Sequence, residues 1–380
     1  MIIGTAALIL VLSVFNGFEG LVKSLYSSIY TDIKISPAKG KVITITDQQL
    51  QRLRNLQGVK NFSLVVEEKA LLQNEDGDYK SMVLLKGVDS NYRFVTGVEQ
   101  HMVIGNYELG NVDSPLLILG VGVESALHVI SDRNIFPLKL YLPKRNSSTT
   151  FDPMTDISAA AVNTSGTFVI QQEFDNKYAI TNLGFVREKL QLGENEYGGI
   201  EIGLKESAES GKLQQQISEI FGRGYSVQTR FEQNRSLYTV MTIEKWVIYA
   251  ILSLILVVAA FNMIGALTML VLEKEKDISV LVALGSNQKF IQRIFLSEGL
   301  LLAFIGGGIG MLVALIIAWL QIKFKLIPLT GGSFLIDYFP VALKPTDFLL
   351  VGATVMIIAL FASWLPSRKA SLNEFNLRSE

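Results

Sequence analysis

The sequence contains no cysteine and only two histidines, and charged residues make up just 18% of its 380 positions. The absence of cysteine excludes disulfides, thiolate catalysis and zinc–thiolate sites. His101 and His128 have no acidic or nucleophilic neighbour at a spacing that suggests catalysis, so we interpret them as ordinary surface or core residues. A net charge of -1 without a basic patch argues against binding to nucleic acid.

Nucleotide and metal motifs are also missing. Neither the G-x-x-x-x-G-K-[ST] phosphate loop nor the H-E-x-x-H metal motif occurs in the chain. The glycine run GGGIG lies inside an apolar segment, where Gly306, Gly310, Ala314 and Ala318 recur every four residues. This spacing predicts close packing of membrane helices rather than a phosphate site. We therefore predict a protein that is not an enzyme, without catalytic or metal-ligating residues, whose energy comes from a partner.

Long uncharged runs are abundant. Three of them cover residues 246–272, 299–322 and 348–365. Crossing a bilayer takes about 20 apolar residues, so each run predicts a transmembrane helix. Residues 1–15 are also apolar, but at a rise of 1.5 Å per residue they span about 22 Å, less than the hydrocarbon core of about 30 Å. No basic anchor precedes them, so we expect a first transmembrane helix whose start lies upstream of Met1.

The first helix is predicted to continue out of the membrane as an amphipathic rod. Its apolar face consists of Phe15, Phe18, Leu21, Val22, Leu25 and Ile29. Such a stripe suits either the lining of an apolar cavity or packing on a neighbouring helix. Asn262, at mid-membrane depth in the second helix, suits either an interhelical hydrogen bond or a polar cavity.

Basic residues set the predicted orientation. They cluster between the second and third spans and again after the fourth: Lys274, Lys276, Lys289, Arg293, Arg368, Lys369 and Arg378. The positive-inside rule places both segments in the cytoplasm. Between the first two spans, β-rich runs such as KVITIT alternate with helical ones such as DQQLQRLRNLQ. The predicted fold class is an α-helical membrane protein with four transmembrane helices and a large mixed α+β extracytoplasmic domain inserted between helices 1 and 2.

A charged, helix-patterned segment separates the second and third spans. In it, Ile278, Leu281 and Val282 have the i, i+3, i+4 spacing of a helix that docks into a groove. A helix lying on the membrane surface would use the same apolar face. Gly285 follows Leu284 and predicts the C-terminal end of this helix.

The same segment carries a family resemblance. DISVLVALGSNQKFIQRIFLSEGLLL resembles the signature of FtsX-like/MacB-type ABC transporter permeases. VLSVFNGFE, TIEKWVIYAILSLILVVAAFNMIGALTMLVLEKEKDI, IDYFPVAL and LPSRKAS are similar, in the same order, to segments of the lipoprotein-releasing permeases of the LolC/LolE type. One departure is Val282, where the family often has arginine, so one contact with the ATPase is expected to be lost or replaced.

The resemblance implies a permease subunit of an ATP-driven complex that extracts lipoproteins from the inner membrane and passes them to a periplasmic carrier. The implied partners are a cytoplasmic ABC ATPase dimer, which would use ATP and Mg, a second permease copy or paralogue, the lipoprotein and the carrier. No cofactor is expected on the permease itself. The implied location is the bacterial inner membrane, multi-pass, with the large domain periplasmic. Two alternatives stay open: an FtsX-like regulator relaying ATPase motion to cell-wall hydrolases, and a MacB-like export permease.

In these terms the predicted organisation is as follows. Residues 1–30 form transmembrane helix 1 and its extension, 31–230 the periplasmic domain, 231–272 a periplasmic extension and transmembrane helix 2, 273–293 a cytoplasmic coupling-helix segment, 294–322 transmembrane helix 3, 323–346 a periplasmic loop, 347–365 transmembrane helix 4, and 366–380 a cytoplasmic tail.

The resemblance also implies three groups of site residues. Coupling to the ATPase is assigned to Asp277, Ile278, Leu281, Val282, Ala283, Leu284 and Gly285. A lipoprotein cavity is assigned to Phe15, Phe18, Leu21, Val22, Leu25 and Asn262. Contact with the carrier is assigned to the loop 143–166, with an apolar patch at Pro153, Met154 and Ile157.

Overall fold

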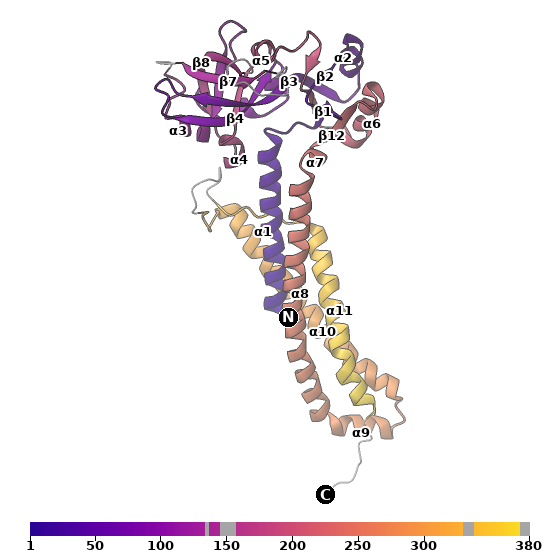
Figure 1. Ribbon diagram of the computed structural model, residues 1–380. Coiled ribbons are helices and arrows are strands. Elements are labelled where there is room, and N and C mark those ends of the chain that lie inside the picture. The colour runs from indigo at the N-terminus through magenta and orange to yellow at the C-terminus, as the bar shows by residue number, and fades with distance from the viewer. Residues whose placement is uncertain (134–136, 145–156, 330–337, 373–380) are drawn as a thin grey trace. The chain divides into compact units, whose positions relative to one another are not determined.

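The computed structural model describes residues 1–133, 137–144, 157–329 and 338–372 (Figure 1). These residues divide into two compact units. The helical unit comprises residues 1–22, 237–329 and 338–372, and the sheet unit comprises residues 23–133, 137–144 and 157–236. Each unit is described by itself below.

Four long helices dominate the helical unit. They are α1 (Ile2–Ser27), α8 (Arg235–Glu273), α10 (Gln288–Phe324) and α11 (Pro345–Leu372), and the short α9 (Glu275–Ala283) lies between α8 and α10. All four are long and apolar enough to cross a membrane, which confirms the predicted number of spans. Because their surfaces are apolar nearly all round, their outward side chains suit hydrocarbon rather than water.

Small residues let these helices approach closely. A Cβ added to Gly310 on α10 would lie 2.6 Å from the carbonyl oxygen of Ile2 and 2.9 Å from the Cβ of Thr5 on α1. Further along α10, Ala314 and Ala318 are fully buried. The predicted small-residue stripe is therefore confirmed as a packing surface, because any larger side chain at Gly310 would push α1 away.

The sheet unit is built on one mixed sheet. Among its described residues, ten strands run in the order β12-β1-β11-β3-β4-β9-β6-β8-β5, with β7 pairing β3 and β8. The strands are β1 (Ile33–Pro37), β3 (Val59–Gln73), β4 (Lys80–Val88), β5 (Met102–Gly105), β6 (Leu116–Gly120), β7 (Leu138–Pro143), β8 (Ile157–Phe168), β9 (Tyr178–Asn182), β11 (Gly199–Leu204) and β12 (Tyr225–Thr229), and β2 (Ile43–Thr44) pairs separately with β10 (Glu196–Tyr197). The α-helices are α2 (Asp47–Arg54), α3 (Val121–Leu127), α4 (Gln172–Asp175), α5 (Leu183–Lys189), α6 (Ser210–Phe221) and α7 (Arg230–Gln233).

Two hydrophobic cores share this sheet. One forms where α2 and α6 cover β1, β11 and the start of β3, and the other where α3 and α5 cover β4, β6, β7 and the end of β3 (Figure 1). The 15-residue strand β3 serves both, with Val59 in the first core and Leu72 in the second. This arrangement matches the predicted mixed α+β domain, and the two cores divide it into two lobes.

Four charged side chains are packed together on the sheet. The Lys86 ammonium lies 2.7 Å from Glu201 Oε1 and 3.0 Å from Glu67 Oε1, while Lys34 Nζ lies 3.2 Å from Glu67 Oε1 and 3.5 Å from Glu201 Oε1. The side chains of Lys86 and Glu201 are only 2% and 3% exposed. Each ammonium lies within 3.5 Å of both carboxylates, so the four charges sum to zero.

The pairing keeps these groups ionised. Burial alone would raise the pKa of Glu67, but the ammonium groups of Lys86 and Lys34 outweigh it and lower the pKa to about 2. Burial alone would lower the pKa of Lys86, but Glu201 and Glu67 help to raise it well above its usual range. Because the folded-state pKa of Glu67 is depressed, its contribution to stability is complete above its ordinary value of 4.5 and is lost as the pH falls towards 2.

Lys86→Met is expected to lower the free energy of unfolding by about 3–5 kcal/mol, because it leaves the buried Glu201 and the partly buried Glu67 with only the Lys34 ammonium between them. Lys41→Met is the matched control, since Lys41 pairs with Glu68 at 2.7 Å but is 73% exposed, and its loss is expected to cost about 0–1 kcal/mol. Calorimetric unfolding of the full chain in detergent measures both. Equal effects of the two substitutions would contradict this account.

Candidate functional site

The segment between the second and third spans forms α9, directly after α8. The chain stays hydrogen-bonded through the junction, since Lys274 N–H donates to Leu270 O and Ile278 N–H donates to Lys274 O, both at 3.0 Å. Asp277 in the first turn of α9 forms an exposed ion pair with Lys274 at 3.1 Å. A carboxylate at this position is favourable because the helix N-terminus carries partial positive charge.

Helix α9 ends at Gly285 in a Schellman motif. The Gly285 N–H donates to Val282 O at 2.9 Å, and the Ser286 N–H donates to Leu281 O at 3.0 Å. Gly285 has φ +91°, a conformation that residues with a Cβ rarely adopt. The predicted C-terminal stop is confirmed, and this glycine turns the chain back into α10.

Ile278 packs α9 against the rest of the helical unit. Its side chain is 3% exposed and belongs to an apolar cluster with Val271, Ile291, Phe295 and Ala370. The predicted docking face is therefore corrected at Ile278, which the chain's own α8, α10 and α11 cover. The i, i+3 periodicity identified an apolar side of α9, but it could not distinguish the side facing the protein from the side facing outward.

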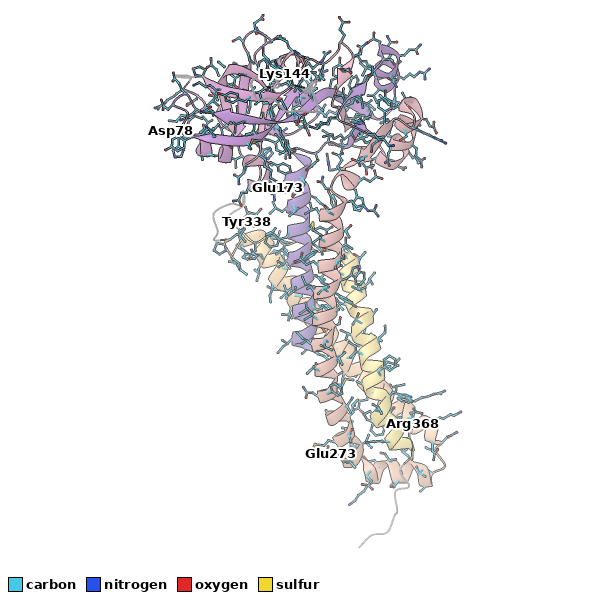
Figure 2. All side chains as sticks on the ribbon, viewed as in Figure 1. Asp78, Lys144, Glu173, Glu273, Tyr338 and Arg368 are labelled. Atoms are coloured by element: carbon cyan, nitrogen blue, oxygen red, sulfur yellow. The ribbon has the colours of Figure 1, made fainter. Side chains whose placement is uncertain are left out.

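The outward side of α9 carries other apolar residues. Val282 is 51% and Leu284 79% exposed, and Ala283 beside them is exposed as well. Leu281 is half-buried and lines an apolar groove of about 240 Å³ between α8, α9 and α10. Lys274, Asp277 and Glu298 also line this groove. Figure 2 shows Glu273 and Arg368 at this same end of the helical unit.

The stripe on α1 is half-buried in the single chain. Phe15, Phe18, Leu21 and Val22 lie in the helical unit, whereas Leu25 belongs to the sheet unit. Phe18 makes an edge-to-face contact with Phe339, with ring centroids 5.8 Å apart. At Phe18, then, the structure shows the packing role that the sequence left open beside the cavity role.

Asn262 is exposed on α8, next to Phe261, which is 65% exposed. Its side chain is therefore accessible at the surface of the helical unit.

The tryptophans mark the ends of the spans. Lys323 Nζ lies 4.9 Å from the ring centroid of Trp319, and Arg368 Cζ lies 5.5 Å from that of Trp364. The third tryptophan, Trp246, directly follows a lysine at the start of its uncharged run. Tryptophans paired with basic residues are typical of the membrane–water interface.

Comparison with known proteins agrees with this arrangement of helices. Residues 249–373, which hold most of α8 and all of α9, α10 and α11, match the family FtsX-like permease C-terminal. The chain therefore contains an FtsX-like permease domain, and its relatives are ABC transporter permeases.

Two relatives match this permease over almost its whole length. The lipoprotein-releasing system transmembrane protein LolC of Neisseria meningitidis serogroup B is 26% identical over 97% of this chain and 89% of the relative. LolE of Haemophilus influenzae is 25% identical over the same shares, 97% and 89%. The macrolide export ATP-binding/permease protein MacB of a Shewanella species is 27% identical over 47% of this chain and 27% of the relative.

The residues predicted to contact a carrier are only partly among the described residues. Ile157 begins β8, where it pairs with Pro143 of β7, and it is half-buried. Pro153 and Met154 lie outside the described residues. Their predicted role stays a prediction.

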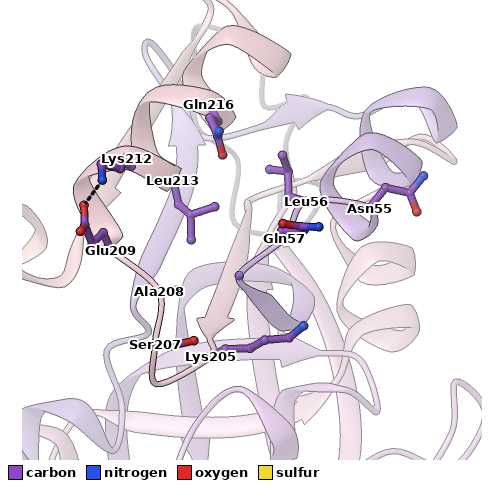
Figure 3. Close-up of a pocket in the computed structure, with 11 residues that line it drawn as sticks. Asn55, Leu56, Gln57, Lys205, Ser207, Ala208, Glu209, Lys212, Leu213 and Gln216 are labelled. Atoms are coloured by element: carbon purple, nitrogen blue, oxygen red, sulfur yellow. Dashed lines mark ion pairs between the residues drawn. The ribbon is translucent and has the colours of Figure 1, made fainter.

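The sheet unit of the permease also has an open cleft of about 520 Å³ beside α6 (Figure 3). Lys212 and Glu209 at the cleft form an ion pair at 2.8 Å, with side chains 77% and 68% exposed. Charged side chains this exposed stay hydrated, so the cleft does not suit an acyl chain. Among the described residues, no group of three or more histidine, aspartate or glutamate side chains could hold a metal ion.

Two polar clusters of the permease were not predicted from the sequence. One is the buried group around Lys86, and the other joins Asn16 of α1, Lys245 of α8 and Asp347 in the first turn of α11. A signal for the second was present, since Lys245 and Asp347 each directly precede an uncharged run. Nothing in the sequence showed that these residues meet.

Ile278→Ala is expected to loosen α9, because the cavity left in a buried cluster costs about 2–5 kcal/mol. Val282→Ala, in the same helix but half-exposed, is expected to cost less than about 1 kcal/mol. Hydrogen exchange of the α9 amides in detergent measures the difference. Faster exchange in the Val282→Ala protein than in the Ile278→Ala protein would show that the buried face is assigned wrongly.

Proposed function

We propose that this permease belongs to an ATP-driven complex that extracts lipoproteins from the bacterial inner membrane and passes them to a periplasmic carrier. The observation that carries the proposal is the extent of the likeness to LolC and LolE, 97% of this chain, which takes in the sheet unit as well as the four spans. The sequence match to the Shewanella MacB covers 47% of the chain. Export of small molecules is therefore the second candidate.

The energetics of extraction fit a permease that depends on a partner. Each acyl methylene withdrawn from the bilayer costs about 0.8 kcal/mol, so removing a multiply acylated protein is strongly uphill. The chain has no phosphate-loop motif that would let it use ATP itself. A cytoplasmic ABC ATPase dimer supplies the energy in this proposal, with ATP and Mg bound there.

The ATPase docks on the outward side of α9. Val282, Ala283 and Leu284 offer an apolar surface there, and Asp277 stands exposed in the first turn. A short helix with an accessible apolar face is suited to a groove on a partner. Val282 replaces the arginine expected in the family, so this contact rests on packing rather than on charge.

The acyl chains are held between two permease copies or paralogues. The α1 stripe of Phe15, Phe18, Leu21 and Val22 is half-buried in one chain and leaves apolar surface for lining such a cavity. Asn262 is exposed on α8, where it suits a hydrogen bond to the second permease or a polar position in the cavity wall.

In this proposal the sheet unit is periplasmic and α9 is cytoplasmic. Because the chain has no cysteine, single-cysteine labelling is free of background. An impermeant thiol reagent applied to spheroplasts is expected to label Lys212→Cys, whose native side chain is 77% exposed. It should label Lys276→Cys only after lysis. Labelling of Lys276→Cys in intact spheroplasts would overturn the orientation.

Leu21→Asp is expected to abolish release of a triacylated lipoprotein from proteoliposomes that contain the permease and its ATPase, because a carboxylate on the stripe is costly beside acyl chains. Leu21 is preferred to Phe18, which packs on Phe339. Gly20→Asp is the matched control, since a side chain added there meets no atom within 4 Å. Lipoprotein transferred to a soluble fraction after addition of ATP and carrier is the measurement.

Leu21→Asp and Gly20→Asp should both retain the ATPase on purification. Leu284→Glu, at the exposed apolar position directly after α9, should lose both the bound ATPase and lipoprotein release. A wild-type complex that hydrolyses ATP but releases no lipoprotein would contradict the proposal. That result would favour export or hydrolase regulation instead.

A further inference from the structure

Three helices of the helical unit, α1, α8 and α11, meet through one polar side chain each. Asn16 follows the apolar start of α1, Lys245 precedes the uncharged run of α8, and Asp347 precedes that of α11. Asn16 Nδ2 donates to Asp347 Oδ2 at 2.5 Å, while Lys245 Nζ donates to Asn16 Oδ1 at 3.0 Å and to Asp347 Oδ1 at 3.2 Å. The three side chains form a closed triangle at the boundary of the spans.

The triangle is enclosed by protein. Asn16 is 2% and Asp347 5% exposed, and only part of the Lys245 side chain, 26%, reaches the surface. The Asn16 amide uses its oxygen for the cation and its nitrogen for the carboxylate, which no apolar or singly charged residue could do. Lys245 and Asp347 together carry no net charge, so they can remain buried beside the apolar spans. Removing either one leaves the charge of the other without compensation.

The chain before α11 closes over the same part of α1. The Ala342 N–H donates to Ser13 O at 2.9 Å, and a Cβ on Gly17 would lie 2.2 Å from Pro340 O. Outside the triangle, Glu19 and Lys344 form a more exposed ion pair at 3.1 Å. Residues 13–19, from the VLSVFNGFE motif, thus contact residues 338–344, from the IDYFPVAL motif and its neighbour.

Helix α8 links this triangle to α9. It is continuous from Arg235 to Glu273, so Lys245 and Glu273 are joined by about 40 Å of unbroken helix at 1.5 Å per residue. When the end of α8 next to α9 is displaced, Lys245 is displaced by a similar amount, because no turn or proline interrupts the helix between Lys245 and Glu273.

We propose that Asn16, Lys245 and Asp347 are positioning residues that latch α1 and α11 to α8. When α8 moves, the latch makes α1 and α11 move with it at the end of the helical unit away from α9. The role rests on the proposed function in one respect, that an ATPase acts at α9. The latch itself is a property of the helical unit and is measured separately from release.

The first measurement reports the latch directly. Glu19→Cys and Lys344→Cys are introduced together, and a short bifunctional maleimide cross-links α1 to the segment before α11 in the purified complex. Lys245→Met or Asp347→Asn in this background is expected to lower the cross-linking yield several-fold. The cysteine-free chain keeps the reaction specific.

The second measurement reports coupling. Lys245→Met and Asp347→Asn are expected to reduce ATP-driven lipoprotein release about three- to thirtyfold, while the complex keeps its ATPase and its basal ATP hydrolysis. Glu19→Gln, which breaks the neighbouring exposed pair, is the matched control and should leave release unchanged.

Exchanging the charges of Lys245 and Asp347 tests whether the contact between them is required, rather than a particular residue type at each position. In Lys245→Asp combined with Asp347→Lys, the Asn16 amide turns over so that its nitrogen meets the new carboxylate and its oxygen the new ammonium. The exchange is expected to restore both cross-linking and release, and it also decides the matter if Lys245→Met fails to fold. Wild-type cross-linking and release in Asp347→Asn, or a folded exchange variant that restores neither, would overturn the latch. If the wild-type complex releases no lipoprotein, the proposed function fails. The cross-linking yields then still show whether the three residues hold α1 and α11 to α8.

Discussion

The rest of the structure depends on keeping uncompensated charge out of apolar surroundings. In the helical unit this constraint places Lys245, Asp347 and Arg368 beside the uncharged runs rather than inside them. Where polar groups are buried at those boundaries, as in the Asn16–Lys245–Asp347 triangle, every charge has an opposite charge within 3.2 Å. The same rule operates in the sheet unit, where Lys86 is buried only because Glu67 and Glu201 flank it.

Features that depend on neighbours in the sequence could be predicted. The spans follow from runs of uncharged residues, and the end of α9 follows from the need for a positive φ at Gly285. The packing role of Gly310 follows from its four-residue spacing with other small residues. Each of these rests on local geometry, which a sequence shows directly.

Features that depend on distant residues could not be predicted. Ile278 is buried because α9 turns back onto Phe295 and Ala370, and the direction of that turn is decided by packing far along the chain. Asn16, Lys245 and Asp347 are separated by 229 and 102 residues, so their meeting reflects the arrangement of three helices. Lys86 and Glu201 are 115 residues apart, so nothing near Lys86 in the sequence indicates that it is buried beside a carboxylate.

Strand β3 has a consequence for how this protein can vary. Because its two ends belong to two cores, the lobes of the sheet unit have no linker between them at which one could be cut away or exchanged. Removing either lobe would strip one end of β3 of its cover and expose an unpaired edge. New recognition surfaces in this fold therefore have to arise at hairpin tips and connecting loops, such as the turn between β3 and β4, while the two-lobed frame is inherited whole.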